Sequence, residues 1–276
     1  MIIDSNTNYG FNSAWGNFSP EFVLDVIGDS VDYAICSNLE GIDAINYKNE
    51  LDCNLDIIRV AQKYKKILPL AVCQVDKMLD NHVMRFLLTE YPKFIGLKLH
   101  PESAKVPANS SKYNKYLELA REFKKPCLFH SGQLNSKYSS PYLIYEKAQE
   151  FPDVPIILGH LAIGDTNAHK EAINIMLDSI EKETATLYCD ISCIDFGTGN
   201  LEDVIMLIEA LKNTSKGDYT NRIFWASDVP IGDFNQANEL YRKNLDNFKV
   251  KISSYFQEEK LVQSILYFNA RDLYGL

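Results

Sequence analysis

Three of the five histidines in this chain end short apolar runs. His100 ends FIGLKLH, His130 ends PCLFH and is followed by Ser-Gly, and His160 ends PIILGH. A fourth run, IFWASD, ends on Asp228. Apolar runs of this length are typical of strands buried in a parallel sheet. Because such strands all point the same way, we expect these four side chains to meet at the carboxyl end of the sheet.

Imidazole nitrogens and carboxylate oxygens are good ligands for Zn²⁺ and similar divalent ions. A bound metal ion lowers the pKa of water to about 7, and a nearby Asp or His can accept or pass the proton. One such histidine is equally well explained as a hydrogen-bonded core residue. Three with an aspartate at one rim indicate a functional site. The other two histidines, His82 and His169, fall in helical patterns and are predicted to lie on the surface.

Helical patterns separate the apolar runs along the whole chain. Strands are predicted at 1–4, 31–37, 67–75, 94–100, 126–130, 154–159, 186–192 and 222–226. Helices are predicted from 20 onward and at 50–66, 77–91, 112–125, 141–151, 167–183, 201–213, 235–248 and 258–274. This alternation predicts parallel strands with helical crossovers, and eight units favour a (β/α)8 TIM barrel over 1–276 as a single domain. An open doubly wound sheet is the alternative, but no Gly-rich dinucleotide loop follows the first strand.

The composition is typical of a globular protein with a large core. The chain has 276 residues, is 46% hydrophobic and carries a formal net charge of -9, which disfavours nucleic acid or an anionic membrane as partner. No apolar stretch approaches the roughly 20 residues that span a bilayer, and no signal peptide is recognised. The six cysteines form no CxxC pair and are expected to be buried thiols in a reducing cytoplasm. A homodimer is left open.

Polar residues follow the first apolar run, at 5–10, and are predicted to form a turn that places Asn6 and Asn8 at the same rim. Lys98, two residues before His100, is expected to bind an anionic substrate group or to pair with a rim carboxylate. Tyr9, Trp15 and Phe18 are expected in a loop that could cover the mouth. Further rim candidates are Asp190, Ser192, Asp195 and the turn at 197–199.

Five segments together resemble the amidohydrolase superfamily, and most closely its amidohydrolase-related branch, which includes aminocarboxymuconate-semialdehyde decarboxylase. They are GLKLHP (96–101), KKPCLFHSG (124–132), FPDVPIILGHLA (151–162), NRIFWASDVPIGD (221–233) and NARDLYGL (269–276). The resemblance implies a barrel and a divalent metal, most often zinc. It implies that His130, His160 and Asp228 bind the metal, that Asp228 handles the proton of the attacking water, and that His160 polarises or orients the substrate.

The chain departs from this family at the end of the first strand. The usual Asp-x-His-x-His is replaced by Asp4-Ser5-Asn6-Thr7-Asn8. An amide oxygen is a weak ligand for zinc, so metal affinity should fall steeply.

Three interpretations follow from this departure. In the first, a metal is still held by His130, His160 and Asp228, with His100 or water completing the shell. In the second, these side chains act as acid–base catalysts without a metal, as in metal-independent lactonases of the superfamily. In the third, the protein is an inactive small-molecule binder. We expect a hydrolase of a carboxylate-bearing amide, ester or lactone, with Asp228 as general base and His160 polarising the carbonyl. Asn6, Asn8, Lys98 and His100 are assigned to substrate. A non-oxidative decarboxylase is the alternative enzyme.

Overall fold

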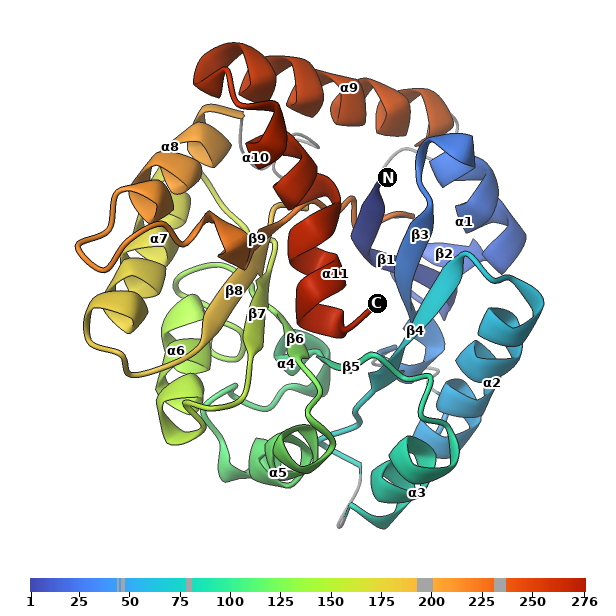
Figure 1. The fold of residues 1–276 in the computed structure, drawn as a ribbon. Helices are drawn as coiled ribbons and strands as arrows, with labels where there is room; N and C mark the ends of the chain where they lie inside the picture. Colours follow the sequence, from blue (N-terminus) through green and yellow to red (C-terminus); the bar gives the residue numbers. More distant parts are fainter. Residues whose placement is uncertain (44, 46–47, 78–80, 193–200, 231–236) are drawn as a thin grey trace.

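The computed structural model describes residues 1–43, 45, 48–77, 81–192, 201–230 and 237–276. Within these residues nine strands form one curled sheet, in the order β2-β1-β3-β4-β5-β6-β7-β8-β9. Neighbours pair in parallel except β1 and β2, which form an antiparallel hairpin. Helices surround the sheet (Figure 1). The fold is therefore mixed α/β, as predicted from the alternation of apolar runs and helical patterns.

The strands are short, and most agree closely with the apolar runs. They are β1 (Ile3–Asn12), β2 (Gly16–Phe18), β3 (Tyr33–Asn38), β4 (Ile67–Val72), β5 (Gly96–Leu99), β6 (Cys127–His130), β7 (Ile156–Gly159), β8 (Leu187–Asp190) and β9 (Ile223–Phe224).

Most α-helices lie close to their predicted positions, but no helix was predicted at 101–104, and the helix predicted to end at 248 continues to Phe256. The α-helices are α1 (Pro20–Ile27), α2 (Glu50–Lys63), α3 (His82–Glu90), α4 (Pro101–Ala104), α5 (Asn114–Phe123), α6 (Pro141–Glu150), α7 (Thr166–Glu181), α8 (Leu201–Lys212), α9 (Ala237–Phe256), α10 (Glu259–Gln263) and α11 (Asn269–Tyr274). Short 3₁₀ turns occupy Gly28–Ser30, Leu39–Gly41, Ser111–Tyr113 and Thr220–Arg222, and a π-helical turn, Ser264–Phe268, joins α10 to α11. Ser19 caps α1 by accepting from the Phe22 N–H, with Pro20 in the first turn, as predicted.

The segment that follows β9 runs beside β1. The Ser5 N–H donates to the Trp225 carbonyl at 3.2 Å, and the Asp228 N–H donates to the Asn6 carbonyl at 2.9 Å. The Asn8 N–H donates to the Val229 carbonyl at 2.7 Å. These three backbone hydrogen bonds bring residues from the two ends of the chain to the same place and fix Asp228 against the first strand.

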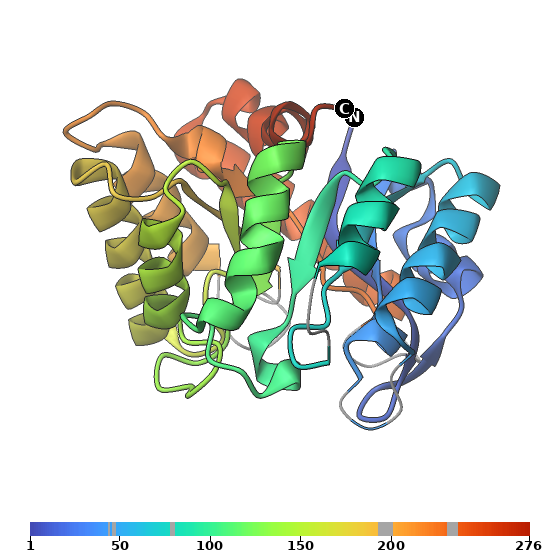
Figure 2. The same ribbon diagram turned by 90° about the horizontal axis from the view of Figure 1, so that it is seen from below.

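The inside of the curled sheet is apolar at one end and polar at the other. Alternate strand residues point inward, and in β6 these are Leu128 and His130. Leu128 belongs to a buried apolar cluster that α11 closes with Ala270 and Tyr274. Figure 1 shows α11 across the centre of the ring, and Figure 2 places both chain termini at that end. The opposite end therefore receives His130 and its polar neighbours.

The first strand is longer than predicted. The polar residues at 5–10 were expected to form a turn, but β1 continues through them to Asn12 and returns as β2. The reason is that their side chains find buried partners; the Thr7 hydroxyl, for example, donates to the Ile35 carbonyl at 3.0 Å. The expectation that Tyr9 belongs to a loop over the mouth was wrong, since Tyr9 lies inside β1 and its hydroxyl donates to Asp56. Phe18 is buried beside Leu39 and Ile42.

His169 is buried, contrary to its predicted surface position. Its side chain has 0% exposure between α7 and α8. The helical periodicity was right, but the polar side chain occupies the buried face because it has hydrogen-bond partners there. Five cysteines (Cys36, Cys53, Cys73, Cys127 and Cys189) are buried and free, as expected. Cys193, Asp195 and the turn at 197–199 lie outside the described residues. None of the described helices is long and apolar enough to cross a membrane.

Candidate active site

A cavity of about 190 Å³ lies at the polar end of the sheet. Six of the seven side chains that the sequence singled out line it: Asn8, Lys98, His100, His130, His160 and Asp228. Apolar side chains complete the wall: Trp15, Leu39, Ile42 and Ile163. The convergence of residues from β1 to the segment after β9 confirms that the apolar runs end at one place. Trp15 is the one member of the predicted aromatic loop that reaches this cavity.

Asn8 holds Asp228 in place. The Asn8 Nδ2 donates to Asp228 Oδ1 at 2.9 Å, and the Asn8 Oδ1 accepts from the Ser37 hydroxyl at 2.7 Å. An ionised carboxylate only accepts hydrogen bonds, so the amide must turn its NH₂ group toward Asp228. The other carboxylate oxygen, Oδ2, lies 3.9 Å from His160 Nε2. Asn8 therefore supports one oxygen of Asp228 and leaves the other facing the histidines.

Asn6 connects Lys98 with Asp190. The Lys98 ammonium donates to Asn6 Oδ1 at 3.2 Å, and Asn6 Nδ2 donates to Asp190 Oδ2 at 3.3 Å. All three side chains are buried. The amide thus accepts from a cation on one side and donates to an anion on the other, which fixes its orientation. Asn6 therefore holds the Lys98 ammonium in place.

A chain of hydrogen bonds runs from His130 to Asp190. His130 Nδ1 lies 3.2 Å from His160 Nε2, and His160 Nδ1 lies 2.8 Å from the Ser192 hydroxyl. The Ser192 hydroxyl donates to Asp190 Oδ1. Because that proton is committed to Asp190, Ser192 accepts from the Nδ1–H of His160. His160 then accepts at Nε2 from the Nδ1–H of His130, which leaves the Nε2 of His130 with a lone pair.

His100 and His130 are stacked, with ring centroids 4.0 Å apart and an interplanar angle of 10°. Burial, together with the charge on Lys98, lowers the pKa of His100 well below its usual value. Burial and the neighbouring His100 do the same for the pKa of His130. Both rings are therefore neutral at pH 7. The Nδ1 of His100 accepts from the Ser103 N–H at 3.2 Å at the start of α4, so its Nε2 carries the proton.

The backbone at both His160 and Asp228 adopts a left-handed conformation, with φ of 68° and 60°. Such conformations cost of order 1 kcal/mol or more in a non-glycine residue, and they persist where the surroundings fix them. The Asp190 carboxylate accepts from the His160 N–H at 2.9 Å. On the other side, the Asp4 carboxylate accepts from the N–H and the hydroxyl of Ser227, the residue before Asp228. Buried carboxylates thus hold the turns that present both side chains.

These residues do not fit a zinc site. Asn8 presents an NH₂ group to Asp228, and its oxygen is already bonded to Ser37. The Lys98 ammonium lies against Asn6, where a second cation would be repelled. In the part of the chain that the structure describes, no three His, Cys, Asp or Glu side chains are arranged to hold a metal ion. The donor chemistry therefore favours hydrogen bonding over metal binding in this cavity.

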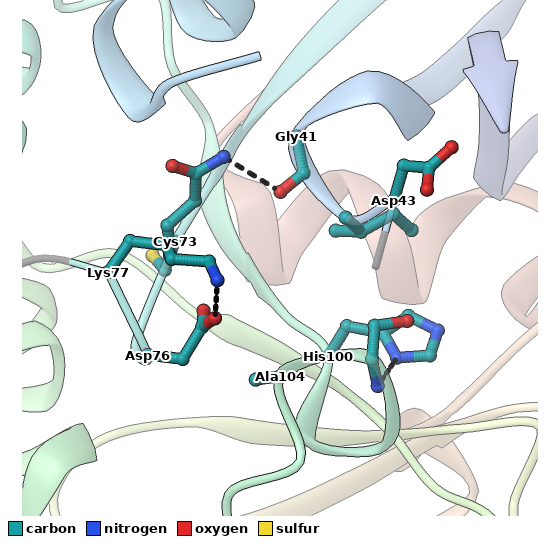
Figure 3. Close-up of a pocket in the computed structure, with 10 residues that line it drawn as sticks. Gly41, Asp43, Cys73, Asp76, Lys77, His100 and Ala104 are labelled. Carbon is teal, nitrogen blue, oxygen red and sulfur yellow. Dashed lines mark hydrogen bonds and ion pairs between the residues drawn. The ribbon is translucent and has the colours of Figure 1, made fainter. Parts of the chain in front are cut away.

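Two further pockets adjoin the cavity. A pocket of about 40 Å³ shares His100 and Ile42 with it and is lined by Asp43, Asp76 and Lys77 (Figure 3). A second pocket of about 440 Å³ shares His130 and Ile163 and is lined by residues 132, 133 and 135–139 together with Glu102. The cavity thus shares wall residues with both pockets.

Several supporting residues were not identified from the sequence. Ser37 is the last residue of the strand predicted at 31–37, without any motif to mark it, and Asp4 was noted only as part of the departure from Asp-x-His-x-His. Asp190 and Ser192 were expected to face the interior, but their hydrogen bonds to His160 could not be read from spacing. Their signal is positional, because Asp190 ends β8 and Ser192 follows it closely, as His160 follows the end of β7.

Comparison with known proteins places this geometry in context. The Amidohydro_2 family model, described as amidohydrolase, matches residues 57–276. No curated protein matches the chain significantly.

Solved structures match over the whole chain at low identity. A candidate 2-pyrone-4,6-dicarboxylic acid hydrolase from Pseudomonas putida is 14% identical, with a TM-score of 0.68, over 99% of this chain and 97% of its own. The 2,6-dihydroxybenzoate decarboxylase from Rhizobium is 12% identical, with a TM-score of 0.67, over 100% and 99%. The 4-oxalomesaconate hydratase from Rhodopseudomonas palustris is 13% identical, with a TM-score of 0.63, over 100% and 96%. At these identities the likeness shows a shared fold.

Proposed function

The chain belongs to the amidohydrolase family, and from that premise we propose that it hydrolyses a small carboxylate-bearing lactone or ester by acid–base catalysis without a metal. The observation that carries this proposal is the pairing of Asn8 with Asp228. One carboxylate oxygen is bonded to the amide at 2.9 Å, and the other faces His160. A carboxylate held in this way presents its second oxygen toward His160, where it can accept a proton as a general base.

We assign the substrate carboxylate to Lys98. Its ammonium is buried and already oriented by Asn6, and a buried cation favours an anionic group over a neutral one. Among the similar structures, the candidate hydrolase and the decarboxylase are both named for carboxylate-bearing compounds. A cavity of roughly 150 Å³ accommodates benzene, so the 190 Å³ here suits a single ring.

The proposed reaction begins when Asp228 Oδ2 takes a proton from a water molecule whose oxygen attacks the lactone carbonyl carbon. The Nε2–H of His100 is placed to donate to the oxygen that gains charge. When the ring C–O bond breaks, the proton held by Asp228 passes to the leaving oxygen, directly or through His160 Nε2, 3.9 Å away. A lactone then gives one ring-opened hydroxy acid, an ester gives an alcohol and a carboxylic acid, and Asp228 is again ionised.

His160 has a different role here from the one the sequence suggested. In its neutral form it donates from Nδ1 and accepts at Nε2, so it polarises a carbonyl only after it has gained a proton. We therefore assign it to proton transfer, with the Ser192 hydroxyl and the Asp190 carboxylate stabilising the imidazolium.

We also propose that the sheet closes as a complete (β/α)8 barrel. Support comes from the backbone hydrogen bonds between β1 and the residues after β9, and from the inward alternation of apolar and polar residues. Closure would align Asp228 with the ends of the other parallel strands.

The proposal is tested on a panel of carboxylate-bearing lactones and esters, with 2-pyrone-4,6-dicarboxylate among them and the matching methyl esters beside them. Chelator-treated protein is expected to release acid from at least one carboxylate-bearing compound, as measured by pH-stat titration. The Asp228→Asn variant should be slower by about 1,000-fold, since it lacks the base. Asp246→Asn, an exposed carboxylate on α9, is the matched control and should retain the full rate.

Two outcomes would replace the proposal. Carbon dioxide released from 2,6-dihydroxybenzoate, without ester hydrolysis, would favour the decarboxylase alternative. Saturable binding of a carboxylate ligand with no turnover of any compound, in wild type and Asp228→Asn alike, would favour an inactive binder.

A further inference from the structure

His169 and Asp203 form a buried pair outside the cavity. His169 lies on α7 with 0% exposure, and its Nδ1 lies 2.8 Å from the Asp203 Oδ2 on α8. Its other nitrogen, Nε2, lies 3.1 Å from the Ala162 carbonyl oxygen. The Thr166 hydroxyl donates to the same carboxylate oxygen at 3.3 Å. Both ring nitrogens are therefore engaged, each by an oxygen.

The chemistry of these two partners requires an extra proton on the pair. A carbonyl oxygen accepts only, so the Nε2 of His169 must carry a hydrogen. An ionised carboxylate also accepts only, so the Nδ1 must carry one as well, unless the proton sits on Asp203 instead. If His169 were neutral and Asp203 ionised, one ring nitrogen would direct a lone pair at an oxygen acceptor, with no proton between these two atoms. Because both ring nitrogens of His169 face buried acceptors, the pair holds one proton more than a neutral imidazole and an ionised carboxylate contain. This proton lies on His169 or is shared with Asp203.

Ala162 belongs to the turn that carries His160. In this turn two consecutive residues, His160 and Leu161, have left-handed backbones with φ of 68° and 57°. The Asp190 carboxylate accepts from the His160 N–H, and the Ser131 hydroxyl donates to the Leu161 carbonyl at 3.2 Å. The bond from His169 to Ala162 is the contact that anchors the exit of this turn to α7 and α8.

We propose that the protonated His169–Asp203 pair is a positioning element for His160, which holds the turn after β7 in the conformation that directs the His160 ring at Ser192 and His130. This inference rests on the proposed role of His160 in catalysis. The pair touches no substrate. It acts by offsetting the cost of two left-handed residues in succession.

The test uses the ring resonances of histidine, because the chain has only five. In ¹⁵N-histidine-labelled protein, loss of a signal in His160→Gln and in His169→Gln assigns each ring. From the hydrogen-bond partners, we expect both ring nitrogens of His169 to carry a proton in wild type and His160 to carry one on Nδ1 alone. In His169→Leu, the Nδ1–H of His160 should exchange with water about tenfold faster, the factor that matches one lost hydrogen bond of about 1.4 kcal/mol.

Two variants separate positioning from general stability. In Asp203→Asn, the amide can donate to a neutral His169 and leave its Nε2–H on Ala162, so the His160 signal should stay as in wild type. Tyr145→Phe removes the hydroxyl that contacts Asp178 and Thr184 near the other end of α7, and it should leave His160 unchanged. Faster exchange at His160 in Tyr145→Phe, or none in a folded His169→Leu, would overturn the proposal.

Wild-type protein supplies a second measurement if His169→Leu does not fold. The Nδ1–H of His160 and the Nε2–H of His169 should exchange with water at similar rates, because the same opening of the turn after β7 exposes both. A His160 N–H that exchanges much faster than the His169 N–H would contradict the inference. These readouts need no substrate, so they stand or fall separately from turnover.

Discussion

The cavity has two sides that differ in what their hydrogen bonds can do. On the side of β1, Asn6 and Asn8 are amides whose donors and acceptors are fixed by Lys98 and Asp228. On the side of β6 and β7, His130 and His160 are joined through groups that can each give or take a proton. The first side sets charge and orientation, and the second can move protons. The acid–base catalysis that we propose uses both sides of the cavity.

The comparison also shows what the two asparagines contribute. Each amide occupies a position where it satisfies a charged neighbour, and a charged group left buried without a partner costs several kcal/mol. The amides therefore maintain a carboxylate and an ammonium at the same cavity. The first three predictions below each change one side of the cavity, and the last changes a buried carboxylate that supports it.

The largest effect is expected from Asn8→Asp, which places a second carboxylate where the amide donates to Asp228. Two carboxylates at this distance share one proton, which should move the acid limb of the pH–rate profile upward by about three units. At pH values below the acid limbs of both proteins, turnover by Asn8→Asp should be about 1,000-fold lower than turnover by wild type. The profile of kcat/KM against pH is the measurement. Ser37→Ala, which changes the other side of Asn8 without adding charge, should leave the limb in place.

The next effect concerns Lys98. Lys98→Met should raise KM for carboxylate-bearing substrates by about 100-fold, the range of a charge-assisted hydrogen bond, and leave kcat nearly unchanged. The matching methyl esters should show little change, and Lys98→Arg should recover part of the loss. Equal losses for acid and ester would show that Lys98 stabilises the fold instead of binding the carboxylate.

On the imidazole side, Ser192→Ala removes the acceptor for the His160 Nδ1–H. We expect kcat to fall by about tenfold, because His160 loses the partner that fixes its tautomer. Ring resonances should show His160 divided between its two tautomers. If the rate and the tautomer both stay as in wild type, the hydrogen-bond chain to Asp190 has no part in the reaction.

The smallest effect on turnover, with a distinct effect on stability, is expected from Asp4→Asn. Burial raises the pKa of Asp4 to about 7, although hydrogen bonds from Ser227 and Tyr241 oppose the shift. The folded chain then keeps a proton that the unfolded chain loses near pH 4. Stability should therefore fall as the pH rises from about 4 to 7, and level off above it. Denaturant titrations should show that Asp4→Asn lacks this slope, a difference on the order of 3 kcal/mol between pH 4.5 and 7.5. The same dependence of stability on pH in wild type and Asp4→Asn would contradict this prediction.

The sequence predicted the elements that bring the site together and missed the contacts that tune it. Apolar runs ending in His100, His130, His160 and Asp228 located the cavity because strand direction alone carries that information. Pattern reasoning failed for the residues at 5–10, which lie inside β1. They were predicted to form a turn because a polar run seldom forms a strand unless its side chains have buried hydrogen-bond partners.

His169 shows the same limit. Its helical position was correct, but a polar residue on a buried helix face cannot be recognised until the carbonyl and the carboxylate that engage it are known. The roles of Ser37 and Ser192 likewise depend on partners that lie 29 and 32 residues away. Spacing along the chain does not encode these pairings.

The most direct test of the account is the metal dependence of turnover on the carboxylate-bearing substrate found in the panel. Protein is treated with chelator, its metal content is measured by elemental analysis, and the rate is recorded before and after zinc is added back. We predict far less than one zinc ion per chain and a rate that neither falls on chelation nor rises with zinc. A rate lost on chelation and restored in proportion to bound zinc would contradict acid–base catalysis by Asp228, His160 and His100 without a metal.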